Sequence, residues 1–220
     1  MIVAIDGPAG AGKSTVARRL AERLGIGYLN TGSMYRAIAL LALRQGVDLD
    51  DAEGLSRLAR AHQIALRTTS EGDRVSIDGD DVTSAVRTPQ VTDAVSQVAS
   101  HRGVRIEIVA LQQRLLRDGD WVADGRDIGT VVCPDADLKV FLTARADERA
   151  RRRHAELLLG GDDVVLGDVL QDIVRRDALD TTRAESPLIA ASDAVQLDTS
   201  ELSVDQVVER LEQLVGESKK

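Results

Sequence analysis

Residues 1–15 read MIVAIDGPAGAGKST, and this stretch decides which fold is expected. Its first five residues form a short apolar run that predicts a buried strand, and residues 7–14 fit the pattern G-x-x-x-x-G-K-[ST]. Apolar residues at helical spacing follow, and Gly25 and Gly27 are expected to end that helix. The order of strand, glycine-rich loop and helix predicts a phosphate-binding loop.

The residue types of this loop suit a nucleoside triphosphate. Glycines let the backbone wrap closely around phosphate groups, and the following helix directs its positive end toward them. We expect Lys13 to reach the terminal phosphates and the Ser14 hydroxyl to bind Mg2+. The residues expected to bind the cofactor are Gly7, Pro8, Ala9, Gly10, Ala11, Gly12, Lys13, Ser14 and Thr15. The loop leaves open whether a substrate or water accepts the phosphoryl group.

Composition excludes several classes of protein. The 220 residues are 43% hydrophobic but only 2% aromatic, which suits one compact domain with an aliphatic core. The formal net charge of −8 argues against a polymeric nucleic acid or an anionic membrane as the main partner. One cysteine cannot form a disulfide within the chain, and the three histidines follow no metal-ligand pattern. Without a signal peptide or a membrane-spanning apolar run, we expect a cytoplasmic protein, and the lack of an obvious apolar patch favours a monomer.

Strand and helix patterns alternate along the rest of the chain. Strands are expected at 121–123, 138–142 and 194–197, with a weaker candidate at 28–29. Helical spacing covers residues 34–45, 104–116, 146–158 and the segment after a capping box formed by Ser203 and Gln206. This alternation predicts an α/β fold with a parallel sheet covered by helices on both faces.

Two regions depart from the alternation. Residues 64–82 alternate in polarity and carry turn signals at 71–73 and 78–80, which predicts a small antiparallel element. Residues 145–180 are almost wholly helical in pattern and highly charged, which favours a mobile lid.

A charged cluster follows the expected strand at 121–123. Asp124, Arg126 and Asp127 come directly after it, and ligands of parallel sheets bind beyond the carboxyl ends of the strands. These side chains are therefore expected on the same rim as the phosphate-binding loop, where Asp124 could hold Mg2+ through water. The alternative is a surface turn closed by a salt bridge.

Two arginine-rich segments in the expected lid region could bind phosphate, but they could also be ordinary surface helices. Arg176 and Asp180 are four residues apart in RRDALDTTR, so they share a face if the helix continues. Arg149 and Arg153 are also four apart and could project toward the transferred phosphate. Taken alone, both segments are more typical of solvated, salt-bridged helices.

Together these landmarks resemble the bacterial cytidylate kinases, which are P-loop nucleoside monophosphate kinases. The matching stretches follow the order of the family: IDGPAGAGKST, LNTGSMYRAIAL, SQVASHRGVR, ADGRDIGTVVCPDADLKVFL and RRDALDTTRAESPL. The resemblance implies a P-loop kinase fold with a five-stranded parallel sheet and transfer of the γ-phosphoryl group of ATP, with Mg2+, to CMP or dCMP. It also implies a core (1–29, 102–144 and 184–220), a monophosphate-binding insert with a small antiparallel sheet (30–101) and a helical lid (145–183).

The resemblance further assigns roles to individual residues. The positions that hold the monophosphate are those of Arg36, Arg126 and Arg183. Guanidinium groups suit this role because one guanidinium can donate to two phosphate oxygens at once. The other residues expected to bind the substrate are Thr31, Tyr35, Ser96, Arg105, Asp124, Asp127, Arg176 and Asp180. The catalytic set, expected to neutralise the transferring group, is Lys13, Arg126, Arg153 and Arg183.

The base-reading residues have a chemical rationale. The resemblance places Ser96, Arg105 and Asp127 around cytosine, and a carboxylate can accept from the N4 amino group of cytosine but not from the O4 atom of uracil. Arg176 and Asp180 fall at ribose-binding positions. Two other classes stay open: a P-loop kinase for another small molecule, such as another monophosphate or shikimate, and a nucleotide-dependent switch protein.

Overall fold

Strand β1 (Ile2–Asp6) lies at the centre of a five-stranded parallel sheet with the order β2-β6-β1-β7-β8. The structure is a computed structural model that describes residues 1–69 and 72–218. The other strands of this sheet are β2 (Gly27–Asn30), β6 (Trp121–Gly125), β7 (Leu138–Thr143) and β8 (Val195–Asp198). The predicted fold class is confirmed, and the weak candidate at 28–29 is the edge strand β2.

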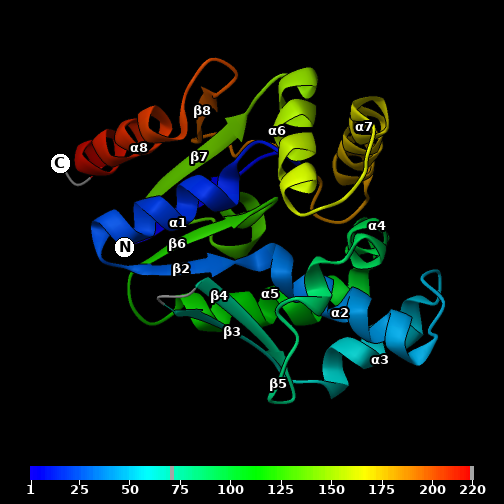
Figure 1. Cartoon of the computed structure of the whole chain (residues 1–220). Helices are drawn as coiled ribbons and strands as arrows, with labels where there is room; N and C mark the ends of the chain where they lie inside the picture. Colours follow the sequence, from blue (N-terminus) through cyan, green and yellow to red (C-terminus); the bar gives the residue numbers. More distant parts are fainter. Residues whose placement is uncertain (70–71, 219–220) are drawn as a thin grey trace.

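Eight helices accompany the strands in the described part of the chain. They are α1 (Lys13–Leu24), α2 (Thr31–Gln45), α3 (Ala52–Ala61), α4 (Pro89–Val98), α5 (Arg102–Leu116), α6 (Ala146–Leu159), α7 (Leu166–Thr182) and α8 (Val204–Ser218). A 3-10 helix spans Ala85–Arg87, and a π-helical turn spans Ile128–Val132. The strands of the large sheet run toward α2 and the α6–α7 pair, so their carboxyl ends face these elements (Figure 1).

Alternating side chains of the strands build two apolar cores. Val3 and Ile5 of β1 pack with α1 and α8 on one face of the sheet. Ala4, between them, packs with α2 and α5 on the other face. Because both faces of the sheet are covered at β1, this strand is apolar on both sides and polar only at its last residue, Asp6.

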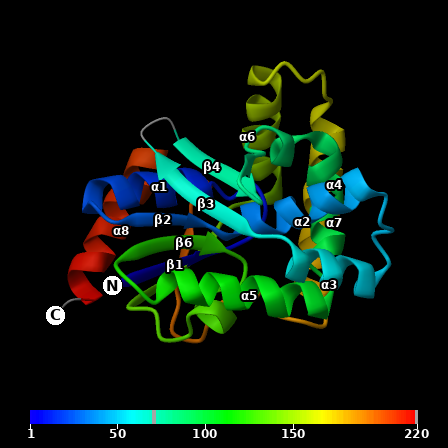
Figure 2. The same cartoon turned by 90° about the horizontal axis from the view of Figure 1, so that it is seen from below.

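A small antiparallel sheet lies beside the large one. Its strands are β3 (Ile64–Thr69), β4 (Gly72–Ile77) and β5 (Asp80–Asp81), as the alternation predicted (Figure 2). The turn predicted at 71–73 falls partly on Glu71, which lies outside the described residues. A hydrogen bond of 3.3 Å from the Thr68 hydroxyl to the Tyr28 carbonyl oxygen joins this sheet to β2.

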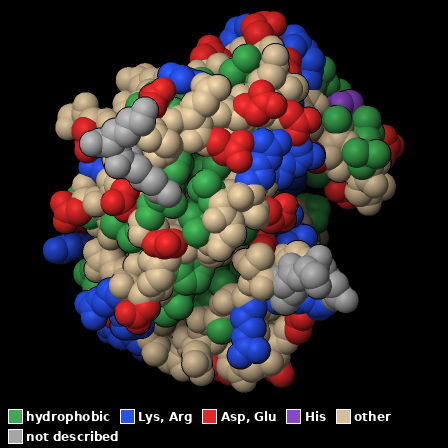
Figure 3. Space-filling view, turned by 90° about the vertical axis from the view of Figure 1, so that its left-hand side faces the viewer, with side chains coloured by type: hydrophobic (Ala, Val, Ile, Leu, Met, Phe, Trp, Pro, Cys, Tyr) green, Lys and Arg blue, Asp and Glu red, His purple; other side chains and the backbone are tan. Residues whose placement is uncertain are grey.

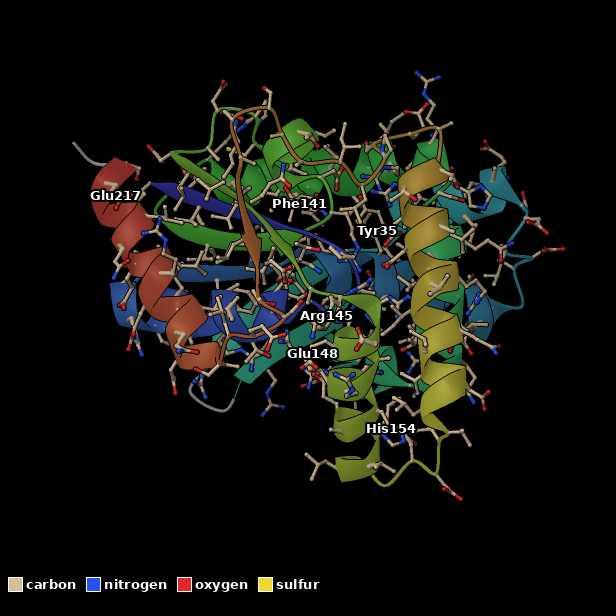
Figure 4. The ribbon with its side chains drawn as sticks, turned by 90° about the horizontal axis from the view of Figure 1, so that it is seen from above. Tyr35, Phe141, Arg145, Glu148, His154 and Glu217 are labelled. Atoms are coloured by element: carbon tan, nitrogen blue, oxygen red, sulfur yellow. The ribbon has the colours of Figure 1, made fainter. Side chains whose placement is uncertain are left out.

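Helices α6 and α7 form a pair beyond the carboxyl edge of the large sheet (Figures 1 and 2). Ala150 of α6 packs against Val169 and Ile173 of α7, so the pair has an apolar core of its own. In Figure 4, Arg145 and Glu148 lie at the end of α6 near the sheet, while His154 lies farther along α6, between the two helices. The His154 ring nitrogen Nε2 is 3.0 Å from the Val164 carbonyl oxygen, which joins α6 to the connection that leads to α7.

Local signals explain several helix ends. Gly25 adopts a left-handed conformation with φ 66° and ends α1, whereas Gly27 already belongs to β2. The predicted capping box is present, since the Gln206 amide donates to the Ser203 hydroxyl and the Ser203 amide to the Gln206 side chain. Helix α2 begins three residues earlier than predicted because the Asn30 side chain accepts from the Ser33 amide.

One face of the molecule is mixed in charge. On the face drawn in Figure 3, basic and acidic side chains alternate around small apolar areas, and neither sign forms a continuous field. Across residues 1–69 and 72–218, no helix has both the length and the hydropathy needed to cross a bilayer.

Candidate active site

A cleft of about 420 Å³ opens at the carboxyl edge of the large sheet. Its walls come from the phosphate-binding loop, α2, α4, the start of α5, the turn after β6 and the α6–α7 pair. The predicted site residues that line it are Ala9, Gly10, Gly12, Lys13, Ser14, Thr15, Thr31, Tyr35, Arg36, Ser96, Arg105, Asp124, Arg126, Asp127, Arg153, Arg176, Asp180 and Arg183. The predicted loop residues Gly7, Pro8 and Ala11 do not line the cleft.

The loop geometry depends on two glycines in particular. Gly7 lies so close to β7 that a Cβ atom there would stand 2.0 Å from the Leu142 carbonyl oxygen. Gly12 has φ 85° and precedes α1 without a side-chain cap, so no side chain takes up the first amides of the helix. An anion in the cleft can therefore bind at the positive end of α1.

Lys13 is buried at the start of α1. Its Nζ donates to the Pro8 carbonyl oxygen at 2.7 Å, so the ammonium group lies within the curve of the loop. Burial, together with the positive charge of Arg126, lowers the pKa of Lys13 well below its usual value. Negative charge in the cleft would favour the protonated form.

Ser14 and Asp124 meet at the base of the cleft. The Ser14 hydroxyl donates to Oδ2 of Asp124 at 2.8 Å, and the Tyr28 hydroxyl donates to Oδ1 at the same distance. The Thr31 hydroxyl donates to the Asp124 main-chain carbonyl at 2.7 Å. Burial raises the pKa of the Asp124 carboxyl, opposed by the charge of Lys13 and the Ser14 hydrogen bond. A desolvated carboxylate in this setting gains from a cation.

The donor set fits Mg2+. A hydroxyl and one carboxylate are hard oxygen ligands, and Mg2+ in nucleotide sites takes one or two carboxylates with phosphate and water completing its shell. Within the described residues, no group of three His, Cys, Asp or Glu side chains could form a complete protein cage for a metal. A cation held by Ser14 and Asp124 would therefore need a phosphate to complete its shell.

A buried ion pair joins the two sides of the cleft. Nε of Arg126, in the turn after β6, lies 2.7 Å from Oδ2 of Asp180 in α7. Burial disfavours the charged forms, but the pairing outweighs it, raising the pKa of Arg126 and lowering that of Asp180. Arg183 lies 3.7 Å from Oδ1 of the same carboxylate. Helix α7 does continue through residue 182, so Arg176 and Asp180 both face the cleft.

Arg36 and Arg176 line the cleft with no carboxylate partner among residues 1–69 and 72–218. NH1 of Arg36 donates to the Val86 carbonyl oxygen at 3.1 Å and to the Thr92 hydroxyl at 2.8 Å, both neutral groups. Burial, followed by the charges of neighbouring arginines with Arg176 first among them, lowers the pKa of Arg36 to about 10. The guanidinium groups thus repel one another while the cleft holds no anion.

The wall opposite the loop contains a second buried pair. Arg105 of α5 donates to Oδ2 of Asp127, and its NH1 donates to the Ala99 carbonyl oxygen at 3.2 Å. The guanidinium lies 5.3 Å from the centre of the Tyr35 ring, and Ser96 of α4 also lines the cleft. These contacts fix the Arg105 guanidinium and the Asp127 carboxylate against each other in the wall of the cleft.

Arg149 and Arg153 of α6 have different surroundings in the structure. Arg153 lines the cleft and pairs with Glu156 at 3.1 Å. Arg149, which could have projected toward the transferred phosphate with Arg153, does not line the cleft. It is buried at the start of α6, where it donates to the Ala9 and Ala144 carbonyl oxygens at 2.9 Å and pairs with Asp177 at 2.7 Å. Three partners hold it away from the cleft.

The chain matches the family model described as "Cytidylate kinase" over residues 3–217. The chain belongs to the cytidylate kinase family. Curated cytidylate kinases from Shouchella clausii and Bacillus subtilis are similar to it, at 51% and 48% identity. The first match covers 98% of this chain and 96% of the relative, and the second covers 95% and 93%. The predicted family and enzyme class, a phosphotransferase of the cytidylate kinase type, are confirmed.

Solved structures agree on the fold of this cytidylate kinase family member. An uncharacterized protein from Eubacterium ventriosum matches with a TM-score of 0.55 at 12% identity, covering 98% of both chains. A shikimate kinase from Bacteroides thetaiotaomicron matches with a TM-score of 0.51 at 14% identity, also covering 98% of both chains. At such low identity these matches support the P-loop kinase architecture only.

Several residues of the family member's cleft were missed by sequence reasoning. Arg18 lies one helical turn beyond Ser14, so helical spacing alone could have placed it on this wall. Asn30 ends β2, and the rule that sites lie beyond strand ends could have found it. Arg87 lies on the 3-10 helix Ala85–Arg87 and Thr92 lies on α4, and no sequence pattern predicted either element. Nothing in the sequence therefore indicated these two residues as part of the site.

Proposed function

We propose that this cytidylate kinase family member transfers the γ-phosphoryl group of ATP to CMP or dCMP, giving ADP and CDP or dCDP. The observation that carries the proposal is the single cleft in which a phosphate-binding loop faces Arg36, Arg126, Arg176 and Arg183. An acceptor that is itself a phosphate requires such a set, because two polyanions must be brought together against their repulsion.

The donor phosphates are assigned to the loop. Lys13 and the amides at the start of α1 would hold the terminal phosphates, with Arg153 approaching from α6. Ser14 and Asp124 would hold Mg2+, whose charge, when bound, offsets the charge of the phosphate oxygens. Arg126 and Arg183 then stabilise the group in transfer and need no reorganisation, since ion pairs with Asp180 already fix them.

The reaction needs no strong general base. The second pKa of a phosphate monoester is about 6, so the acceptor is mostly dianionic at neutral pH and already nucleophilic. Asp124 and Asp127 therefore serve to position groups, and catalysis consists of alignment and charge neutralisation.

We assign the base to Ser96, Arg105 and Asp127, all of which line the cleft. Oδ2 of Asp127 is occupied by Arg105, and the remaining carboxylate capacity can accept from the N4 amino group of cytosine. Uracil would place an oxygen against that carboxylate, and a desolvated mismatch of this kind costs about 1–3 kcal/mol. We place the ribose against Arg176 and Asp180, beside Thr31 and Tyr35.

This assignment divides the chain by task. Residues 1–29, 102–144 and 184–220 form the core, 30–101 the monophosphate-binding insert and 145–183 the lid. The cytoplasm is the predicted compartment, and a monomer is the predicted state.

The test is a coupled assay of ADP formation with ATP and Mg2+ and a panel of CMP, dCMP, UMP, AMP and GMP. We expect kcat/KM to be highest for CMP and dCMP, and ATP hydrolysis without acceptor to be slow. Arg126→Ala should lower kcat by about 100-fold or more, as loss of a transition-state donor does. Equal kcat/KM for CMP and UMP would contradict the acceptor assignment and leave the phosphate-binding loop unaffected.

A further inference from the structure

Asp6 is a buried carboxylate to which the proposed reaction gives no role. It ends β1, directly before the phosphate-binding loop, and is only 6% exposed. Its Oδ1 accepts from the Ile128 amide and its Oδ2 from the Gly129 amide, each at 2.8 Å. Asp6 pairs with Gly125 in the register of β1 and β6, which brings its carboxylate to the residues just after β6.

The two amides belong to the start of the π-helical turn Ile128–Val132. Amides at the start of a helix lack partners within the helix, and the side chain of the residue before it usually accepts from them. Here that residue is Asp127, one of the residue types that cap best, yet its side chain makes no capping bond. Its carboxylate pairs with Arg105 and lines the cleft.

We propose that Asp6 caps the turn in place of Asp127 and so keeps the Asp127 carboxylate available to the acceptor base. Asp6 is then a positioning residue, since it acts on the substrate only through Asp127. The proposal rests on the assignment of Asp127 to the base, which is part of the proposed function.

The charges around the two carboxylates support separate roles for Asp6 and Asp127. Two carboxylates lie close together, and the charge of Asp127 disfavours ionisation of Asp6. Each carboxylate has its own donors: two amides for Asp6 and the Arg105 guanidinium for Asp127. Without an acceptor at position 6, the orphaned amides and the Asp127 carboxylate would attract each other, because buried amides need a partner.

The variant that tests the role is Asp6→Asn. Asparagine keeps the volume but replaces one acceptor with a donor, which leaves one of the two amides unpaired. We expect the ratio of kcat/KM for CMP to that for UMP to fall by about tenfold, equivalent to about 1.4 kcal/mol. The dissociation constant of ATP should change by less than about threefold, since both hydrogen bonds of the Asp6 carboxylate go to the turn after β6 and only its charge acts on Lys13.

A double-mutant cycle with Asp127→Asn separates this role from general loosening. If Asp6 acts through Asp127, then Asp6→Asn leaves the CMP to UMP ratio unchanged in the Asp127→Asn background. Asp51→Asn is the matched control, because Asp51 caps α3 through the Gly54 amide at 2.9 Å, far from the cleft. A normal ratio in Asp6→Asn beside a reduced ratio in Asp127→Asn would overturn the inference.

A crystal structure of the Asp6→Asn protein gives a readout that does not depend on the acceptor. An Asp127 carboxylate turned from Arg105 to the amides of the π-helical turn supports the inference. Asp127 still paired with Arg105 overturns it. Equal use of CMP and UMP by the unaltered protein would contradict the proposed function, and this structure would still decide the role of Asp6.

Discussion

The Tyr28 hydroxyl donates a hydrogen bond of 2.8 Å to Oδ1 of Asp124. The other oxygen of that carboxylate accepts from Ser14, so Tyr28 holds one oxygen while the second faces the loop. Burial of the phenol and, after it, the negative charge of Asp124 raise the pKa of Tyr28, which therefore stays a donor at any working pH. Strand β2 thus orients a carboxylate of strand β6.

Tyr28→Phe should weaken Mg2+ use. Loss of a hydrogen bond to an ionised group costs about 1.5–3 kcal/mol, so the Mg2+ concentration for half-maximal rate should rise by about tenfold or more. Direct Mn2+ binding in the presence of ATP, followed by electron paramagnetic resonance, should weaken in parallel.

Tyr35→Phe is the comparison variant for this prediction. It also removes a phenolic hydroxyl that lies near the cleft, but its ring packs by Arg105 and not by Asp124. Its Mg2+ dependence should stay unchanged. Equal Mg2+ dependence in the Tyr28 variant and the unaltered protein would show that the hydrogen bond does not orient Asp124.

A divalent anion should stabilise the free protein. Arg36 and Arg176 face the cleft without carboxylate partners in the described chain, and an anion that binds only the folded state adds about 2.7 kcal/mol at 100 times its Kd. Sulfate should therefore raise the Tm in thermal unfolding more than chloride at equal ionic strength. Arg176→Ala should reduce the difference between the salts, and identical shifts with both salts would argue against an anion site.

Arg149 should be required for stability more than for chemistry. Arg149→Met removes the bonds to the Ala9 and Ala144 carbonyl oxygens and leaves Asp177 without its cation, which should cost about 2–4 kcal/mol of unfolding free energy. Urea unfolding measures this. Arg153→Met, one turn farther along α6, should change stability by less than about 1 kcal/mol because its pair with Glu156 is exposed. Equal losses in the two variants would contradict the distinction.

Stability should depend on pH through Asp6. Burial, the largest effect, raises the pKa of Asp6 from 3.8 to about 6 despite the two amide donors. The folded chain therefore binds this proton more tightly than the unfolded chain, and the associated stability is complete below about pH 4 and lost as the pH rises through about 6. The unfolding free energy of the unaltered protein minus that of Asp6→Asn should fall by up to about 3 kcal/mol from pH 4 to pH 7. A difference in unfolding free energy that stays the same from pH 4 to pH 7 would contradict this prediction.

Local patterns were sufficient for the central fold. The loop at residues 7–14, the alternating strands and helices and the antiparallel element at 64–82 each depend on neighbouring residues, and each is present. The cleft residues at strand ends, such as Asp124, were predictable because parallel strands end at one edge.

What sequence could not supply were contacts between distant segments. The Arg149 side chain meets Ala9, 140 residues away, and the Asp6 carboxylate meets the Ile128 amide, 122 residues away. Charge and helical period do not distinguish Arg149 from Arg153, because both are arginines on the same expected helix. Only tertiary packing shows that Arg149 is buried against the loop while Arg153 lines the cleft. Helices α3 and α4 were also missed, and they carry part of the apolar core beneath α2.

The contacts of α6 limit the movements that we expect for the outer part of the molecule. Arg149 joins the start of α6 to the phosphate-binding loop and to α7, and Ala150 and His154 join α6 to α7 and to the connection between the two helices. We therefore expect α6 and α7 to move as one unit about the start of α6. Such a movement would change access to the cleft while the contact between Arg149 and the loop persists.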